Sequence, residues 1–432
     1  MTCLACICVL FFISSAHAAP KIQHWVTDNG VRVYFFPAHE LPMLDLRVVF
    51  DAGAAKDGDK HGLALLTNGL MAEGAGQWDS TQIAERFEGV GAGFSNGAYR
   101  DMSLLSLRSL TDKKLLNTAL ETFKVVLNDP RFPKEAFERE KSRLLVSLAR
   151  KKQSPAAIAN EAFYRAVYKN HPYAFSADGE VETVKALTTD DLKAFYDQYF
   201  VAKNAIVALV GDVSRAQAES IVNRVTGDLT VGKAAAKTKS AAPLDQAEVI
   251  SIDFPSSQTH ILVGQQGMKR GDPDYFPLYI GNHILGGSGL VSVLADEIRE
   301  KRGLAYSAYS YFIPMRAEGP FILGLQTKNE SADEALTVLR ETLSNFVEKG
   351  PTEAQLIAAK KNLVGGFALK IASNKKIVEN LASIGFYGLR LDYLDKFIEK
   401  VEAVDIAQIK DAFRRRVHPD NMVTVIVGGK TK

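Results

Sequence analysis

The strongest constraint on the fold of this 432-residue chain is an internal repeat. The segment PKEAFEREKSRLLV (133–146) resembles PTEAQLIAAKKNLV (351–364), at an offset of 218 residues. The segment DLKAFYDQYFVAKNAIVALVGDV (191–213) resembles QIKDAFRRRVHPDNMVTVIVGGK (408–430), at an offset of 217 residues. Chance similarity between amphipathic helices would not give two matches at nearly one offset. The repeat therefore predicts that a domain of about this length was duplicated.

A linker is predicted between the two copies. The stretch VGKAAAKTKSAAPLDQ (231–246) is rich in Ala, Lys and Ser and has no apolar periodicity. Such a composition is typical of an exposed connection. We therefore expect an N-terminal domain over 19–230, a linker over 231–246 and a C-terminal domain over 247–432.

The hydrophobic patterns predict strands and helices in both domains. Strand-like apolar runs occupy 31–36, 44–50, 103–110 and 205–211. Helix-like runs occupy 115–127 and 332–349, and Thr188 begins another helix. Strands are grouped before helices instead of alternating strictly with them. We therefore expect an α+β fold in which each domain is a mostly antiparallel sheet packed with helices.

The first residues, MTCLACICVLFFISSAHAAP, have the pattern of a secretory signal. An apolar stretch runs over 4–13, and Ala16-His17-Ala18 fits the small-x-small cleavage rule, so a signal peptide over 1–18 is predicted. The segment has no Lys or Arg before its apolar stretch, which leaves open a short membrane anchor or a lipoprotein. We expect an exported protein, in a bacterial periplasm, with no membrane span after signal cleavage.

Two function classes lose support from composition. All three cysteines lie in the predicted signal peptide, so the mature chain is expected to have no disulfide, thiol nucleophile or Cys metal ligand. The net charge of +2, without any basic run, gives no reason to expect a nucleic-acid partner.

One stretch has the outline of a zinc-binding helix without its zinc ligands. Residues 62–71, GLALLTNGLM, resemble the G-L-A-H-x-x-E-H-M helix of the pitrilysin (insulinase-type) zinc-peptidase family. In that family the two His bind zinc and the Glu is the general base. Leu65, Asn68 and Gly69 stand at these three positions, and the stretch that matches the third ligand, 144–148, has no acid. Leu and Gly offer zinc no donor, and Asn cannot act as a base at neutral pH. The resemblance therefore implies that this chain binds no metal and is not a peptidase by itself.

A relocated metal site near the same helix is an open alternative. His61 directly precedes the helix, and Asp57, Asp59 and Glu73 are close in sequence. No two histidines of the mature chain lie three to five residues apart, so no local pair of His ligands exists. The other interpretation is a solvated helix start.

The second half resembles the family more closely. The segment ILGGSGLVSVLADEIREKRGLAYSAYS (284–310) matches the family's Gly-rich turn, helix and following strand. The resemblance implies that Gly286 and Gly287 form a flexible substrate-binding turn. It also implies that Arg299 and Tyr306 reach into a zinc site, where they hold the substrate backbone and stabilise the oxyanion. The alternative is a surface charge on a helix and an ordinary strand aromatic.

A peptide-binding edge strand is also implied. In the family, the strand that follows the segment matching 91–98 pairs with extended peptide, and here that strand would be 99–107. Asn96 and Ala98 would contribute to substrate binding. Such strand addition depends on backbone hydrogen bonds and would survive the loss of zinc. An ordinary sheet strand is the alternative.

Together these features predict a noncatalytic, substrate-binding subunit of a heterodimeric zinc endopeptidase that degrades or processes peptides. The scheme is similar to that of mitochondrial processing peptidase, in which each chain forms half of a clam-like chamber. This chain would hold no cofactor, and a homologous partner with an H-x-x-E-H motif would bring the zinc. The alternative is a scaffold of the same fold with no part in proteolysis, and a homodimer is left open.

Overall fold

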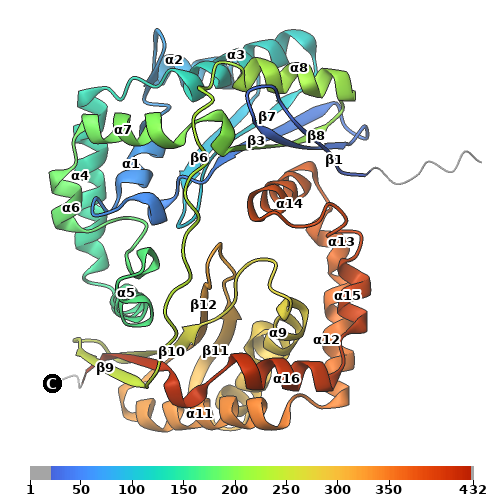
Figure 1. Ribbon diagram of the computed structural model, residues 1–432. Helices are drawn as coiled ribbons and strands as arrows, with labels where there is room; N and C mark the ends of the chain where they lie inside the picture. Colours follow the sequence, from blue (N-terminus) through green and yellow to red (C-terminus); the bar gives the residue numbers. More distant parts are fainter. Residues whose placement is uncertain (1–20, 430–432) are drawn as a thin grey trace, which may run out of the picture.

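The computed structural model describes residues 21–429, and the predicted signal peptide lies outside the described residues. Two sheets lie in separate halves of the molecule, each with its own layer of helices (Figure 1). No helix within the described residues is both long enough and apolar enough to cross a membrane.

The first sheet has six strands in the order β1-β2-β8-β3-β7-β6. Only the β2–β8 pair is parallel. The strands are β1 (Gln23–Val26), β2 (Arg32–Pro37), β3 (Met43–Phe50), β6 (Gly93–Ala98), β7 (Ser103–Leu110) and β8 (Ala205–Gly211). A separate two-stranded ribbon joins β4 (Gly74–Ala75) and β5 (Trp78–Asp79).

The second sheet repeats this arrangement with five strands, in the order β9-β13-β10-β12-β11. Again only one pair, β13 with β9, is parallel. The strands are β9 (Glu248–Asp253), β10 (Gln258–Gln266), β11 (Ala305–Phe312), β12 (Pro320–Lys328) and β13 (Val423–Gly428). Each corresponds in order to β2, β3, β6, β7 and β8 of the first sheet. The expected α+β fold with mostly antiparallel sheets is confirmed.

The helices follow the same repeat. Those of the first half are α1 (Leu63–Leu70), α2 (Ser80–Glu88), α3 (Lys113–Asn128), α4 (Lys134–Lys151), α5 (Pro155–Tyr168), α6 (Val181–Ala186), α7 (Thr189–Tyr199) and α8 (Arg215–Thr226). Those of the second half are α9 (Tyr275–Asn282), α10 (Val293–Ala295), α11 (Ala332–Lys349), α12 (Glu353–Gly365), α13 (Phe367–Lys370), α14 (Asn374–Tyr387), α15 (Phe397–Ala403) and α16 (Ile406–Arg416). Thr188 and Asp405 begin α7 and α16 with equivalent capping boxes, to Asp191 and Gln408 respectively. Such caps satisfy backbone N–H groups of the first helical turn.

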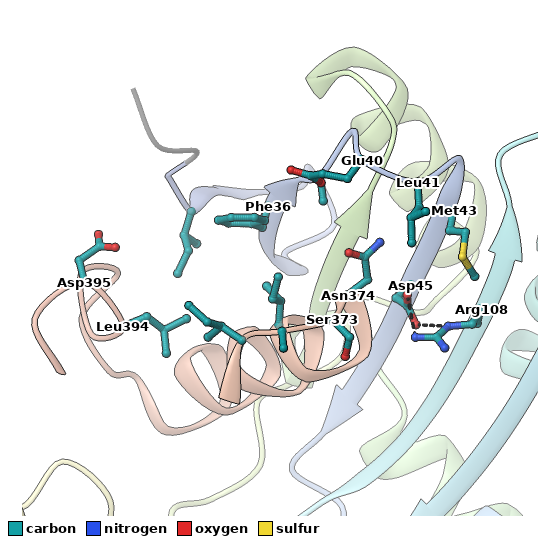
Figure 2. Close-up of a pocket in the computed structure, with 15 residues that line it drawn as sticks. Phe36, Glu40, Leu41, Met43, Asp45, Arg108, Ser373, Asn374, Leu394 and Asp395 are labelled. Atoms are coloured by element: carbon teal, nitrogen blue, oxygen red, sulfur yellow. Dashed lines mark hydrogen bonds and ion pairs between the residues drawn. The ribbon is translucent and has the colours of Figure 1, made fainter. Parts of the chain in front are cut away.

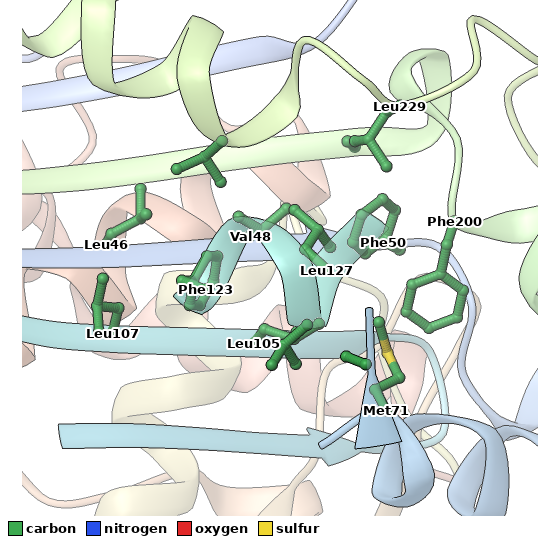
Figure 3. Close-up of a cluster of buried hydrophobic side chains, with 14 of the residues drawn as sticks. Leu46, Val48, Phe50, Met71, Leu105, Leu107, Phe123, Leu127, Phe200 and Leu229 are labelled. Carbon is green, nitrogen blue, oxygen red and sulfur yellow. The ribbon is translucent and has the colours of Figure 1, made fainter. Parts of the chain in front are cut away.

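The core of the first half lies between its sheet and the helices that cover one face of it (Figure 3). Leu46, Val48 and Phe50 of β3 are buried there against Phe123 and other apolar side chains of α3. Alternate residues of a strand point to the same face, so the apolar residues at every second position of β3 form this layer. Burying each such side chain contributes about 1.5–3 kcal/mol.

The other face of each sheet is covered by a helix from the opposite half. Helix α14, late in the chain, packs through Val378 and Leu381 on Tyr34, Ile206 and their neighbours in the first sheet. Helix α5, early in the chain, packs on β10 and β13 of the second sheet. Figure 1 shows both helices on the sides of the sheets that face the opposite half. The two equivalent helices are therefore exchanged between the halves.

A buried polar network joins the halves beside these helices. The Asp51 carboxylate forms ion pairs with Lys56 (3.3 Å) of its own half and with Arg316 (3.4 Å) of the other. The Asp101 carboxylate accepts hydrogen bonds from the Tyr173 hydroxyl and from the backbone N–H of Arg316 (2.7 Å). The network links the two halves through charges that are largely removed from water.

Candidate functional site

The helix that resembles a zinc-binding helix is α1, and its three motif positions have different surroundings. Leu65 is half-buried, Asn68 is fully buried and Gly69 is exposed. A Cβ atom added at Gly69 would meet no other atom within 4 Å, so a longer side chain would fit there. The stretch 144–148, where the third ligand would lie, belongs to α4, which packs beside α1.

Asn68 serves as a structural bridge. Its Nδ2 donates a hydrogen bond to the Leu104 carbonyl of β7 (3.2 Å). The backbone carbonyl of Asn68 accepts a hydrogen bond from Nδ2 of Asn96 in β6 (2.6 Å). The residue that stands in place of the general base therefore ties α1 to two strands of the first sheet.

The alternative of a relocated metal site near α1 is not supported, because three of the four candidate ligands have other partners. The His61 ring stacks on Phe175 with 3.7 Å between centroids, and burial lowers its pKa. Asp57 accepts hydrogen bonds from backbone N–H groups at the start of α1, and Glu73 pairs with Arg139. Within residues 21–429, no group of three or more His, Cys, Asp or Glu side chains could hold a metal ion.

Asp57 gives the stability of this region a pH dependence. Burial raises its pKa to about 7 from the ordinary value of 3.8, against the lowering effect of the N–H donors of Ala64 and Gly62. Between these pH values the folded chain keeps a proton that the unfolded chain has lost. The free energy of unfolding is therefore expected to fall by a few kcal/mol (order of magnitude) as the pH rises from about 4 to about 7.

The substitution Asp57→Asn removes this titration. The free energy of unfolding of the variant should therefore change less between about pH 4 and about pH 7. Urea unfolding of both chains at pH 5 and pH 7.5 measures the difference. Equal pH dependence in the two chains would contradict the assignment to Asp57.

The structure places Arg299 and Tyr306 next to each other. The Arg299 guanidinium carbon lies 5.0 Å from the centroid of the Tyr306 ring. Tyr306 is 80% exposed, whereas Arg299 is half-buried. Lys301 and Arg302 both bind Glu297. Among the described residues, the Arg299 guanidinium has only a long contact to an acidic group, the exposed Glu300 (3.6 Å). An arginine fork and a phenol hydroxyl are thus presented together at the surface.

Local irregularities set this arrangement. Arg299 lies in a π-helical segment, Asp296–Glu300, and such segments are frequent at functional sites. Gly303 follows with a φ of +64°, which glycine adopts without strain, and turns the chain into β11. The pairing of β11 with β12 then shifts register between Ala305 and Ala308, which leaves Tyr306 in a bulge. Bulges of this kind redirect side chains.

Gly286 and Gly287 lie in a second π-helical segment, His283–Gly287, beside β11. A Cβ atom at Gly286 would lie 2.3 Å from the backbone nitrogen of Ser310, so only glycine allows this approach. Gly286 is buried and Gly287 is exposed. The glycine turn, which the sequence predicted to be flexible, therefore has regular π-helical and 3-10 geometry.

The predicted peptide-binding strand over 99–107 is wrong. Strand β7 (Ser103–Leu110) is paired on both sides, with β3 and with β6. The edge of the first sheet is β6, which contains Asn96 and Ala98. In the second sheet the equivalent edge strand is β11, which contains Tyr306.

Sequence reasoning also missed a cavity of about 440 Å³ beside the glycine turn. Four tyrosines line it: Tyr275, Tyr279, Tyr309 and Tyr311. A signal was available, because Tyr275 and Tyr279 are four apart in a helix and Tyr309 and Tyr311 are two apart in a strand. Each pair therefore shares a face.

A larger cavity, of about 570 Å³, lies elsewhere, between the first sheet and the start of α14 (Figure 2). Asp45 and Arg108 form a two-hydrogen-bond ion pair at its wall, with distances of 2.9 and 3.2 Å. None of the predicted site residues lines it.

Comparison with known proteins agrees with this geometry. The model of insulinase (peptidase family M16) matches residues 40–178, and that of the peptidase M16 inactive domain matches residues 186–363. The chain is 41% identical to a peptidase M16 inactive domain from Pseudomonas fluorescens. That crystal structure superimposes with a TM-score of 0.92, over 95% of this chain and 98% of the other.

Two curated relatives span nearly the same length. The non-peptidase homolog YmxG of Helicobacter pylori is 25% identical over 412 residues, which are 94% of each chain. The uncharacterized zinc protease YmxG of Bacillus subtilis is 22% identical over 407 residues, 94% of this chain and 98% of the other. The two sheets of this chain have matching strand order, and its helix α1 lacks the zinc-binding side chains. The two family models and the 41% identical relative show that the chain belongs to the insulinase-type peptidase family M16.

Proposed function

We propose that this chain is the noncatalytic, substrate-binding subunit of a two-chain zinc endopeptidase. A homologous partner with an H-x-x-E-H motif brings the zinc and the general base, and this chain brings Arg299 and Tyr306. The partner's site lies against the second half of this chain, and each chain forms half of a chamber around the peptide. The complex works outside the cytoplasm, in a bacterial periplasm, after removal of the leader over 1–18.

The observation that carries the proposal is the exposed pair of Arg299 and Tyr306 on the bulged edge strand β11. A phenol that is 80% exposed is free to donate to an oxyanion supplied from outside this chain. The Arg299 fork, with only a long contact to Glu300, is free to hold a peptide carbonyl. A scaffold that takes no part in proteolysis has no need of both groups together.

Reconstitution tests the proposal. The mature chain and an H-x-x-E-H homologue from the same organism are purified, and zinc content and peptide cleavage are measured for each alone and for the mixture. We expect this chain alone to hold no zinc and cleave nothing, and the mixture to cleave faster than the homologue alone. As a control, a homologue with Gln in place of the motif Glu should leave the mixture inactive.

Two other results would overturn the proposal. Zinc and activity in the isolated chain would mean that a metal site exists elsewhere. A mixture that cleaves no faster than the homologue alone would favour the scaffold.

A further inference from the structure

The tyrosine-lined cavity beside β11 has flat apolar walls. The Tyr275 and Tyr279 rings stack with 5.6 Å between centroids and 7° between planes, and the Tyr309 and Tyr311 rings stack at 5.4 Å and 6°. Burial raises the pKa of Tyr311 to about 12, further above physiological pH than the ordinary value of 10. Walls of this kind bind aromatic or aliphatic side chains well.

The cavity also contains a cation without an anionic partner. Arg270 lines it, and its Nε is buried without a hydrogen-bond partner. Within residues 21–429 its guanidinium forms no ion pair, whereas Lys56 and Arg316 of the buried network between the halves both pair with Asp51. A partly desolvated cation without a partner costs free energy, which a bound carboxylate would offset.

The side chains that line the cavity are either positively charged or neutral. None of its lining residues is acidic. Lys370 lies next to it and donates a hydrogen bond to the Tyr279 hydroxyl (2.8 Å). The backbone of the glycine turn, at Gly286 and Gly287, forms part of the same lining. The site therefore favours an anionic group attached to an apolar one.

The position of the cavity relates it to Arg299 and Tyr306. Tyr306 and Tyr311 lie on the same edge strand, five residues apart. At about 3.3 Å per residue, the separation along the strand is roughly 17 Å. An extended peptide that lies along β11 with one residue at Tyr306 would place a residue about five positions away at the cavity.

We propose that this cavity is a subsite for a peptide carboxylate, with Arg270 as its counter-ion and the four tyrosines around an adjoining apolar side chain. The carboxylate is either the C-terminal group of the peptide or an Asp or Glu side chain. The inference rests on the proposed function for its peptide ligand. It requires binding by this chain alone, without the partner.

Binding of N-acetylated octapeptides to the mature chain, measured by isothermal titration calorimetry, tests the subsite. The peptides have an uncharged sequence and a terminal Phe, and they end either in a free carboxylate or in an amide. A third peptide has the amide and one internal Glu. We expect at least one carboxylate peptide to bind about ten- to a hundredfold more tightly than the uncharged amide. Preference for the free acid alone assigns the C-terminus, and tight binding of the Glu peptide assigns a side chain.

Variants then locate the site. Arg270→Gln should abolish the preference for a carboxylate, whereas Lys269→Gln, which removes the same charge from an exposed neighbour outside the cavity, should retain it. Equal binding of all three peptides, or an unchanged preference in Arg270→Gln, would overturn the proposal. The comparison of peptides on the unaltered chain decides the question even if the variant does not fold. Failure of reconstituted cleavage with intact carboxylate binding would count against the proposed function and not against the subsite.

Discussion

Replacing Tyr306 with phenylalanine is expected to lower kcat of the reconstituted two-chain enzyme about a hundredfold, with little change in KM. The substitution keeps the ring and its contact with Arg299 but removes the hydroxyl. Loss of one donor to a developing oxyanion costs about 10²–10³ in kcat, because the interaction is made mainly in the transition state. Since Tyr306 is 80% exposed in the isolated chain, the substitution should not change the stability of that chain. Steady-state kinetics of the mixture and thermal unfolding of the variant measure the two effects.

A matched control is available at Tyr99, which is 58% exposed and lies in the first half. Tyr99→Phe should leave kcat unchanged. Arg299→Lys provides a second comparison, because it keeps the charge but loses the planar fork of donors, and we expect mainly a higher KM. Turnover by Tyr306→Phe equal to that of the unaltered complex would remove the assigned role.

Replacing Asp51 with alanine is expected to destabilise the chain by about 3–5 kcal/mol. Asp51 is the common partner of Lys56 and Arg316, and its side chain is 9% exposed. Burial raises the pKa of this carboxyl even though both cations lower it, so the ion pairs only partly offset the cost of its burial. Without Asp51, two cations lie between the halves with no counter-ion. Removing one member of a buried charge group costs more than the group itself contributes.

Denaturant unfolding at pH 7 measures the change. Asp392→Ala is the control, because Asp392 pairs with Arg390 at the surface, where the Arg390 side chain is 80% exposed. Its expected effect is small, because solvent screens an exposed ion pair. A loss below about 1 kcal/mol in Asp51→Ala would mean that water or a rearranged side chain replaces the carboxylate.

Much of the fold follows from local patterns in the sequence. The runs over 103–110 and 205–211 become β7 and β8 with the same bounds, since each is long, apolar and β-branched or alternating. Strand β6 was missed as the edge because its sequence, GFSNGA, contains two glycines and no apolar alternation. Its place in the sheet depends on pairing with β7, which is a long-range contact.

Other features have no signature in a single sequence. An amphipathic pattern shows that α5 and α14 each have an apolar face, but it does not say which sheet covers that face. For the site, the resemblance of the segment 284–310 to the family singled out Arg299 and Tyr306, which their spacing alone would not have done. Their contact itself depends on a π-helical segment and a β-bulge. Each is a local change in backbone hydrogen bonding that leaves residue composition unaltered.

The exchange of α5 and α14 has a consequence for biosynthesis. When the ribosome has produced the chain as far as β8, the apolar face around Tyr34 and Ile206 still lacks α14, and α5 has no sheet to cover. The roughly 160 residues that separate β8 from α14 take on the order of 10–30 s to synthesise. Throughout that time the nascent chain exposes two surfaces that would aggregate if they met another copy. A chain of this design is best kept unfolded by chaperones until its last segment has emerged, which is also the state in which an exported polypeptide can be threaded through a membrane.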